Sequence, residues 1–174
     1  MKRMYLSLWG SGKNSIDDVI KKLDQYEKEI KQKTETFVRK LSELGVTEAY
    51  QVLAFEGSGD APRDADFQVE VDGNGKPIRA IIRASGEGLL FWEFGAGNYY
   101  NGMQSPNPKA AELGMGIGTY PEQTHVPDPG YWYYYKDGEA KATRSVGTEA
   151  TMPMYRASIE MITRMGEIAK EVFG

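Results

Sequence analysis

The carboxylate of Glu93 is the side chain of this sequence best placed to do chemistry, because it lies between Trp92 and Phe94. An acid between two aromatic residues is costly to bury unless it finds hydrogen-bond donors. Two interpretations stay open. The side chain lies on the open face of a strand, or it accepts backbone N–H groups from the glycine turn that follows it. A catalytic role for Glu93 ranks below both.

Two glycine-containing segments approach ligand-binding loops but lack residues that such loops need. Residues 10–14 approach a phosphate-binding loop, but Ser7 stands where the pattern needs glycine, and Asn14 where it needs Ser or Thr. Residues 70–81 approach a calcium loop, but Ile81 stands where a bidentate glutamate is needed. We therefore expect no metal and no cofactor.

The chain has no cysteine and a single histidine, His125. Disulfides, thiolate metal sites, cysteine nucleophiles and paired-histidine metal sites are therefore excluded. A hydrolase that uses Glu93 with Asp128 or His125 is a weak alternative, because nothing in the spacing brings these groups together. We expect the chain not to be an enzyme.

Hydrophobic periodicity predicts a long N-terminal helix over residues 15–44, with Ser15 as its N-cap and Gly45 just after its end. At 1.5 Å per residue, about thirty residues span roughly 45 Å, which is longer than a compact domain of this size needs. We therefore expect part of this helix to pack on another subunit. Thr47 is predicted to cap a second, short helix.

The rest of the pattern predicts a single α+β domain over residues 1–174. Alternating residues from Phe67 onward predict an antiparallel β-meander whose third strand runs from Leu89 to Phe94. A long Gly/Pro-rich loop over residues 95–130 follows, and its length predicts a functional segment. We expect it to be an extended assembly loop that becomes ordered on assembly. A C-terminal helix capped by Thr151 is expected to pack on the sheet.

Aromatic residues are dense near both ends of this loop. Tyr99 and Tyr100 lie near its start, and a strand over residues 131–136 follows it. Alternation puts Trp132 and Tyr134 on one face of that strand. Such a face suits a protein interface, where Tyr and Trp are enriched, or the stacking of sugar rings.

The net charge of −4 conceals an acidic middle region. Residues 46–130 hold five Lys or Arg against twelve Asp or Glu, a balance of −7. That balance argues against ordinary DNA binding, which needs a basic surface. It is compatible with a channel through which DNA passes without specific binding. No run approaches the ~20 apolar residues of a membrane span, so no membrane partner is expected.

The order of these parts resembles one protein family. Phe91–Gly97 ends the meander, Gly118–Pro121 lies in the loop, Trp132 marks the aromatic strand, and Gly147–Met154 enters the last helix. The Glu-Phe-Gly-x-Gly motif and the Thr-x-Pro-Met helix entry are the markers with the most weight. Together they resemble the minor tail component, or neck, family of long-tailed bacteriophages and prophages, over roughly residues 4 to 173.

This resemblance implies a structural protein of head–tail joining or tail completion, without enzymatic activity. Its partners would be itself, in a ring that is commonly hexameric, and other phage neck or tail proteins. It would occur in the host cytoplasm during assembly and then in the virion tail or neck. The alternative is a carbohydrate-binding module that uses exposed Tyr and Trp. The candidate interface residues are Glu93, Phe94, Gly95, Gly97, Tyr99, Tyr100, Trp132 and Tyr134.

Overall fold

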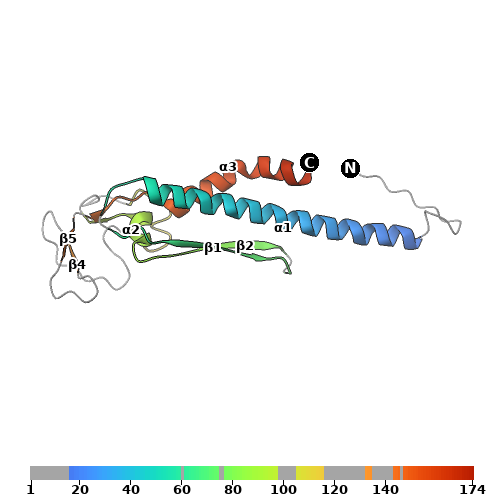
Figure 1. Cartoon of the computed structure of the whole chain (residues 1–174), viewed down its shortest axis with the longest axis horizontal. Helices are drawn as coiled ribbons and strands as arrows, with labels where there is room; N and C mark the ends of the chain where they lie inside the picture. The colour runs from blue at the N-terminus through green and yellow to red at the C-terminus, as the bar shows by residue number, and fades with distance from the viewer. Residues whose placement is uncertain are drawn as a thin grey trace.

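The computed structural model describes residues 16–59, 61–74, 77–97, 105–115, 132–134, 143–145 and 147–174. It confirms an α+β fold with a long N-terminal helix, an antiparallel sheet and a C-terminal helix (Figure 1). The helices are α1 (Ile16–Phe55), α2 (Leu89–Phe94) and α3 (Pro153–Phe173). The strands are β1 (Asp66–Asp72), β2 (Arg79–Ser85), β3 (Ala96–Gly97), β4 (Trp132–Tyr134), β5 (Thr143–Ser145) and β6 (Gly147–Thr148).

Helix α1 continues without a break through Gly45 to Phe55, so the prediction of two separate helices was wrong. Gly45 is buried in the middle of the helix, and its role is close packing. A Cβ at this position would lie 2.7 Å from the sulfur of Met161 and 3.1 Å from Cδ1 of Ile82. Gly45 was predicted to follow the end of the helix. It is instead the position in α1 that α3 and β2 both approach.

Strands β1 and β2 form a two-stranded antiparallel ribbon that packs against α1. Within the ribbon Phe67 pairs with Ala84. At the turn, the N–H of Asn74 donates to the side chain of Asp72 over 3.0 Å, as expected for a tight hairpin. The ring of Phe67 is buried and meets Tyr50 of α1 edge to face, with ring centres 4.7 Å apart.

The predicted third strand of the meander is instead helix α2, which is a correction of the sequence analysis. Leu89, Trp92 and Glu93 are buried at spacings of three and four residues, which puts them on one helical face. Six residues of mostly apolar character fit a buried strand or a short buried helix equally well. Gly95 ends α2 with φ of 81°, a conformation that favours glycine.

Helix α3 lies antiparallel along α1, which separates it from most of the ribbon (Figure 1). The ring of Phe173 packs at a tilt against that of Phe37 at one end, and Arg156 pairs with Glu56 at the other. The expectation that the last helix packs on the sheet therefore needs correction, because α3 contacts α1 and α2 and approaches the sheet at Gly45. A small core joins the three layers, and its buried members are Ala49, Leu53, Phe67, Leu89, Trp92 and Ala157.

Candidate functional site

Glu93 is 7% exposed and its carboxylate binds the first turn of α3. Oε2 accepts the N–H of Met154 at 2.7 Å, and Oε1 accepts the N–H of Tyr155 at 3.0 Å. Oε1 also accepts the amide of Asn107 at 2.8 Å. We call this cluster of Glu93, Asn107, Met154 and Tyr155 the Glu93 junction. The prediction that Glu93 accepts backbone N–H groups is confirmed. The predicted source of these N–H groups was wrong, because they belong to Met154 and Tyr155 and not to the adjacent glycine turn.

The Glu93 junction takes the place of an N-terminal capping side chain, which the residues at the start of α3 do not provide. The residue at its N-cap position is Met152, which has φ of 59° and makes no capping hydrogen bond through its side chain. Thr151, the predicted cap, is buried and its hydroxyl oxygen has no hydrogen-bond partner within the described residues. The first N–H groups of a helix need an acceptor and favour a negative charge. Glu93 supplies both from a distant part of the chain.

Burial raises the pKa of Glu93 above its ordinary value of 4.5. The N–H groups of Met154 and Tyr155 and the amide of Asn107 act in the opposite direction, because they stabilise the ionised form. The net direction is upward, so the loss of water around this carboxylate outweighs its three donors.

Backbone groups next to Glu93 extend the junction to a second loop. The carbonyl of Trp92 accepts the N–H groups of Thr151 and Met152 at 2.9 and 3.0 Å. The carbonyl of Phe94 accepts the hydroxyl of Ser105 at 2.8 Å. Ser105 and Asn107 therefore tie residues 105–115 to the end of α2. Asn107 is 3% exposed and had no signal in the sequence beyond its position in a turn-rich segment.

The indole of Trp92 fixes the other side of α2. Its Nε1–H donates to the carbonyl of Pro62 at 2.9 Å. The guanidinium carbon of Arg63 lies 3.8 Å from the centre of the ring, a cation–π distance. Arg63 also donates to the carbonyls of Leu53 and Gly57, at the end of α1. Trp92 and Arg63 together join the end of α1 to α2.

The predicted interface residues fall into three groups. Glu93 and Phe94 are buried inside the chain, so in this conformation they support a surface and do not form one. Gly95 ends α2, and Gly97 pairs with Gly147 between β3 and β6. Trp132 and Tyr134 lie in β4, which pairs with β5, while Tyr99 and Tyr100 lie outside the described residues. Glu93, Phe94, Gly95 and Gly97 therefore lie at the end of α2 and in β3. The predicted face of Trp132 and Tyr134 stays a prediction.

A second feature lies at the opposite end of α1. The turn of the ribbon reaches Glu35, and the end of α3 reaches Phe37. Residues 16–33 project beyond both as an overhang about 27 Å long (Figure 1). Large apolar side chains on this overhang are 39% to 58% exposed. We call them the overhang stripe, and they are Ile16, Ile20, Leu23, Tyr26 and Ile30.

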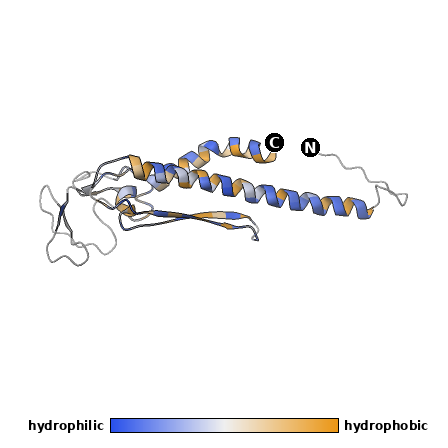
Figure 2. Cartoon of the chain, in the orientation of Figure 1, coloured by the Kyte–Doolittle hydropathy of each residue, from blue (hydrophilic) through white to orange (hydrophobic). Residues whose placement is uncertain are grey.

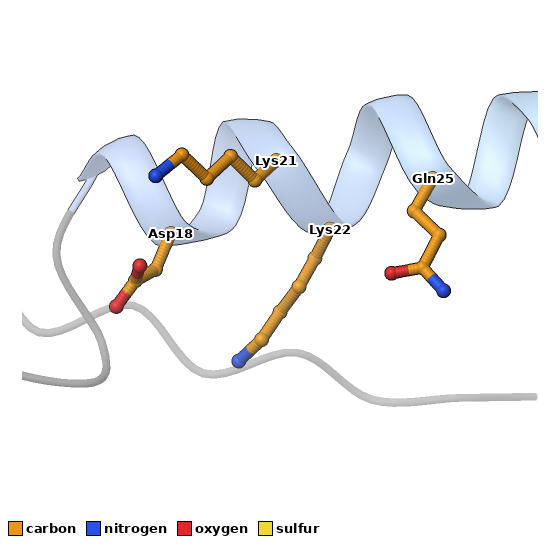
Figure 3. A pocket seen from close by; sticks show the side chains of 4 residues that line it. All are labelled: Asp18, Lys21, Lys22 and Gln25. Atoms are coloured by element: carbon orange, nitrogen blue, oxygen red, sulfur yellow. The ribbon is translucent and has the colours of Figure 1, made fainter.

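Polar side chains on the overhang do not assemble a chemical site. A shallow hollow at its start is lined by Asp18, Lys21, Lys22 and Gln25, all from one helix (Figure 3). Within the described part of the chain, no group of three His, Asp or Glu could hold a metal ion. The helices that the structure describes include none with the length and apolar character needed to cross a membrane.

No family model, no curated protein and no solved structure matches this chain.

Proposed function

We propose that this chain is a structural protein of a phage or prophage neck or tail, which acts in head–tail joining or tail completion by forming a ring with neighbouring subunits. In this proposal the chain has no catalytic role. It assembles in the host cytoplasm and ends in the virion, and its partners are copies of itself and other neck or tail proteins.

The overhang stripe is the observation that carries the proposal. The overhang is mostly hydrophilic, and hydrophobic residues recur along it (Figure 2). The side chains of the overhang stripe are exposed. Soluble proteins tolerate single exposed apolar residues, but a continuous exposed row marks an interaction surface. A helix that extends about 27 Å past the described ends of α3 and the ribbon presents that row to another molecule.

The Glu93 junction supports the same function in another way. It joins α2 to α3 and holds residues 105–115 against the end of α2. A segment that becomes ordered against neighbouring subunits benefits from a rigid anchor at its end. Such an anchor reduces the conformational entropy that the segment loses on assembly. In this proposal, the junction is a structural hinge at the start of the assembly loop.

The mass of the purified protein tests the proposal. It should be measured alone and together with candidate neck and tail proteins, over a range of concentrations. We expect a ring in at least one of these mixtures. A strict monomer that binds neither itself nor any neck or tail protein would contradict the proposed function.

The acidic middle region supports a secondary proposal, that residues 46–130 line a channel through which DNA passes without binding. Its balance of −7 repels phosphate groups. Reversing several of these acids should slow DNA passage and reduce infectivity. Unchanged infectivity of the reversed variant would contradict the channel.

A further inference from the structure

We propose that the overhang stripe packs against the same stripe of a second copy, with the two α1 helices parallel and in register. This inference rests on the proposed ring, and it names the surface through which neighbouring copies meet. The occupant is a second copy of this chain and not a different protein.

The spacing of apolar residues on the overhang is that of a helix–helix seam. Ile16, Leu23 and Ile30 recur every seven residues, and Val19 and Tyr26 fall three residues after the first two. Such a repeat keeps one face of a helix against a partner helix over several turns. The rest of α1 already holds these residues in a helix, so association does not have to nucleate it.

A parallel, in-register pair gives five apolar layers. Four stripe residues meet their own counterparts, and Val19 adds the fifth layer, while Ile20 of the stripe lies beside the seam. The four are Ile16, Leu23, Tyr26 and Ile30. The next position of the repeat is Lys33, near the place where the ribbon turn reaches Glu35. The apolar seam therefore ends where the rest of the fold begins. Its length matches the part of α1 that has no cover from α3 or the ribbon.

Antiparallel pairs fit this sequence less well. The register that retains the layers between residues 19 and 30 also puts Ile16 against Lys33 of the second copy. Shifting by one heptad removes that conflict but puts Lys22 opposite Lys22 of the second copy, and it shortens the seam. The parallel pair also brings Lys33 opposite Lys33 at the end of its seam. It keeps five apolar layers, however, whereas each of these antiparallel registers keeps four.

Charges beside the seam favour the parallel arrangement. Lys22 and Glu27 lie at the two positions that flank the seam. In a parallel pair, a residue at the first flanking position of one helix faces the residue five places later on the other helix. Lys22 of each copy then faces Glu27 of the second copy. Helices of a cyclic ring that run along its axis are parallel and at equal height. The seam is therefore compatible with the ring when the overhangs of all copies gather around that axis as a parallel bundle.

Single cysteines test the arrangement cleanly, because the chain has none of its own. The variants are Ile16→Cys and Ile30→Cys, each oxidised alone and then as a mixture. A disulfide needs Cα atoms within about 7 Å, and these two positions are roughly 21 Å apart along the helix. In a parallel, in-register pair each variant alone forms a disulfide, and its mass doubles on a non-reducing gel.

The matched control is Lys28→Cys, which lies on the same overhang but on the opposite face. We expect it to remain monomeric on the same gel. A second measurement uses Leu23→Glu, which should abolish the assembled mass while leaving the helical content of the monomer unchanged, because Leu23 is already 47% exposed. Lys28→Glu, on the polar face, should assemble as the wild type does.

Three outcomes would overturn the inference. The first is a disulfide between Val19→Cys and Ile30→Cys when they are mixed, with none in either alone, which indicates antiparallel helices. The second is a disulfide between Leu23→Cys and Ile162→Cys, because Ile162 lies on α3 and is 65% exposed. The third is no disulfide in a protein that forms a ring. The last outcome leaves the proposed function intact. Conversely, self-linked Ile16→Cys and Ile30→Cys in a protein that stops at a dimer, forms no ring and binds no neck or tail protein would support the seam and contradict the proposed ring.

Discussion

At the scale of single residues, Glu93 is the acceptor on which the start of α3 depends. We expect Glu93→Gln to lower the free energy of unfolding by about 1–3 kcal/mol, because one oxygen is replaced by an NH₂ group and a buried N–H loses its acceptor. Urea unfolding at pH 7 measures the change. Glu112→Gln is the matched control, because Glu112 pairs with Lys109 on the surface. Equal midpoints for Glu93→Gln and wild type would contradict this role.

The same variant isolates the effect of pH on Glu93. Because the pKa of Glu93 is raised in the folded chain, its contribution to stability is full below the unfolded value near 4.5 and declines as pH rises through the folded pKa. Glu93→Gln has no such group. The stability difference between wild type and Glu93→Gln should therefore shrink from pH 4 to pH 7. A difference that grows over this range would mean that the three donors outweigh burial.

Thr151 separates the sequence-based capping prediction from the structure. If Thr151 capped α3, Thr151→Val would cost about 1 kcal/mol. Its hydroxyl is instead buried without a partner in the described residues, so an apolar side chain of the same shape should be neutral or slightly stabilising. Thermal unfolding of wild type and Thr151→Val distinguishes the two. A clear loss of stability in the variant would restore the capping role.

The sequence allowed part of this site to be predicted. Glu93 between two aromatic residues predicted a carboxylate in need of backbone donors, and that part was right. Its donors at Met154 and Tyr155 and its partner Asn107 could not be predicted, because their proximity to Glu93 arises only from tertiary packing. One local signal existed, the absence of a capping side chain at Met152, but Thr151 next to it concealed that signal.

At the scale of elements, two glycines should respond oppositely to the same substitution. A Cβ at Gly88 would clash with the carbonyl oxygen of Pro62, which also accepts the indole N–H of Trp92. Gly88→Ala should therefore cost 1–3 kcal/mol or more, an approximate range for forced overpacking. Gly166 lies within α3 with nothing within 4 Å of such an atom. Gly166→Ala should stabilise by roughly 0.5–1 kcal/mol through helix propensity.

Urea unfolding of the two alanine variants provides the measurement, and each serves as the control for the other. Similar effects at both positions would contradict the close approach between α2 and the segment at Pro62. The comparison also tests whether α2 is a helix, because Gly88 precedes its first residue.

Elements with a clear period were predictable, and short ones were not. The ribbon, the start of α1 and α3 follow from alternation or from a three-to-four spacing that extends over many residues. Helix α2 has six residues, too few to distinguish the two periods, and its glycine neighbours resemble hairpin turns. Gly45 was misinterpreted because its reason, contact with Met161 and Ile82, lies in other elements.

At the scale of the whole molecule, the two ends of α1 should differ in stability. Residues 42–55 carry the buried positions of α1, whereas residues 16–33 carry none. Backbone amides of residues 16–33 should therefore exchange hydrogen faster in dilute protein, because opening them exposes little buried surface. Hydrogen-exchange mass spectrometry at low and high protein concentration measures this. Assembly should slow exchange in residues 16–33.

Leu23→Glu provides the control, because its overhang should exchange rapidly at both concentrations. Uniform protection along α1 in dilute wild type would contradict the overhang as an uncovered segment. The sequence did predict a helix too long for its own domain, since length follows directly from a count of residues. It did not predict where cover from α3 and the ribbon would stop, at Phe37 and Glu35.

Because α1 is unbroken, insertions in it would change the distance between the overhang stripe and the core. Seven residues inserted after Ile30 would move the stripe about 10 Å further from the core and rotate it by only about 20°. Five inserted residues would rotate it by roughly 140°, away from its original side. Related chains could therefore differ in reach by whole heptads and still meet their neighbours on the same side, whereas other changes in length would turn the contact surface aside.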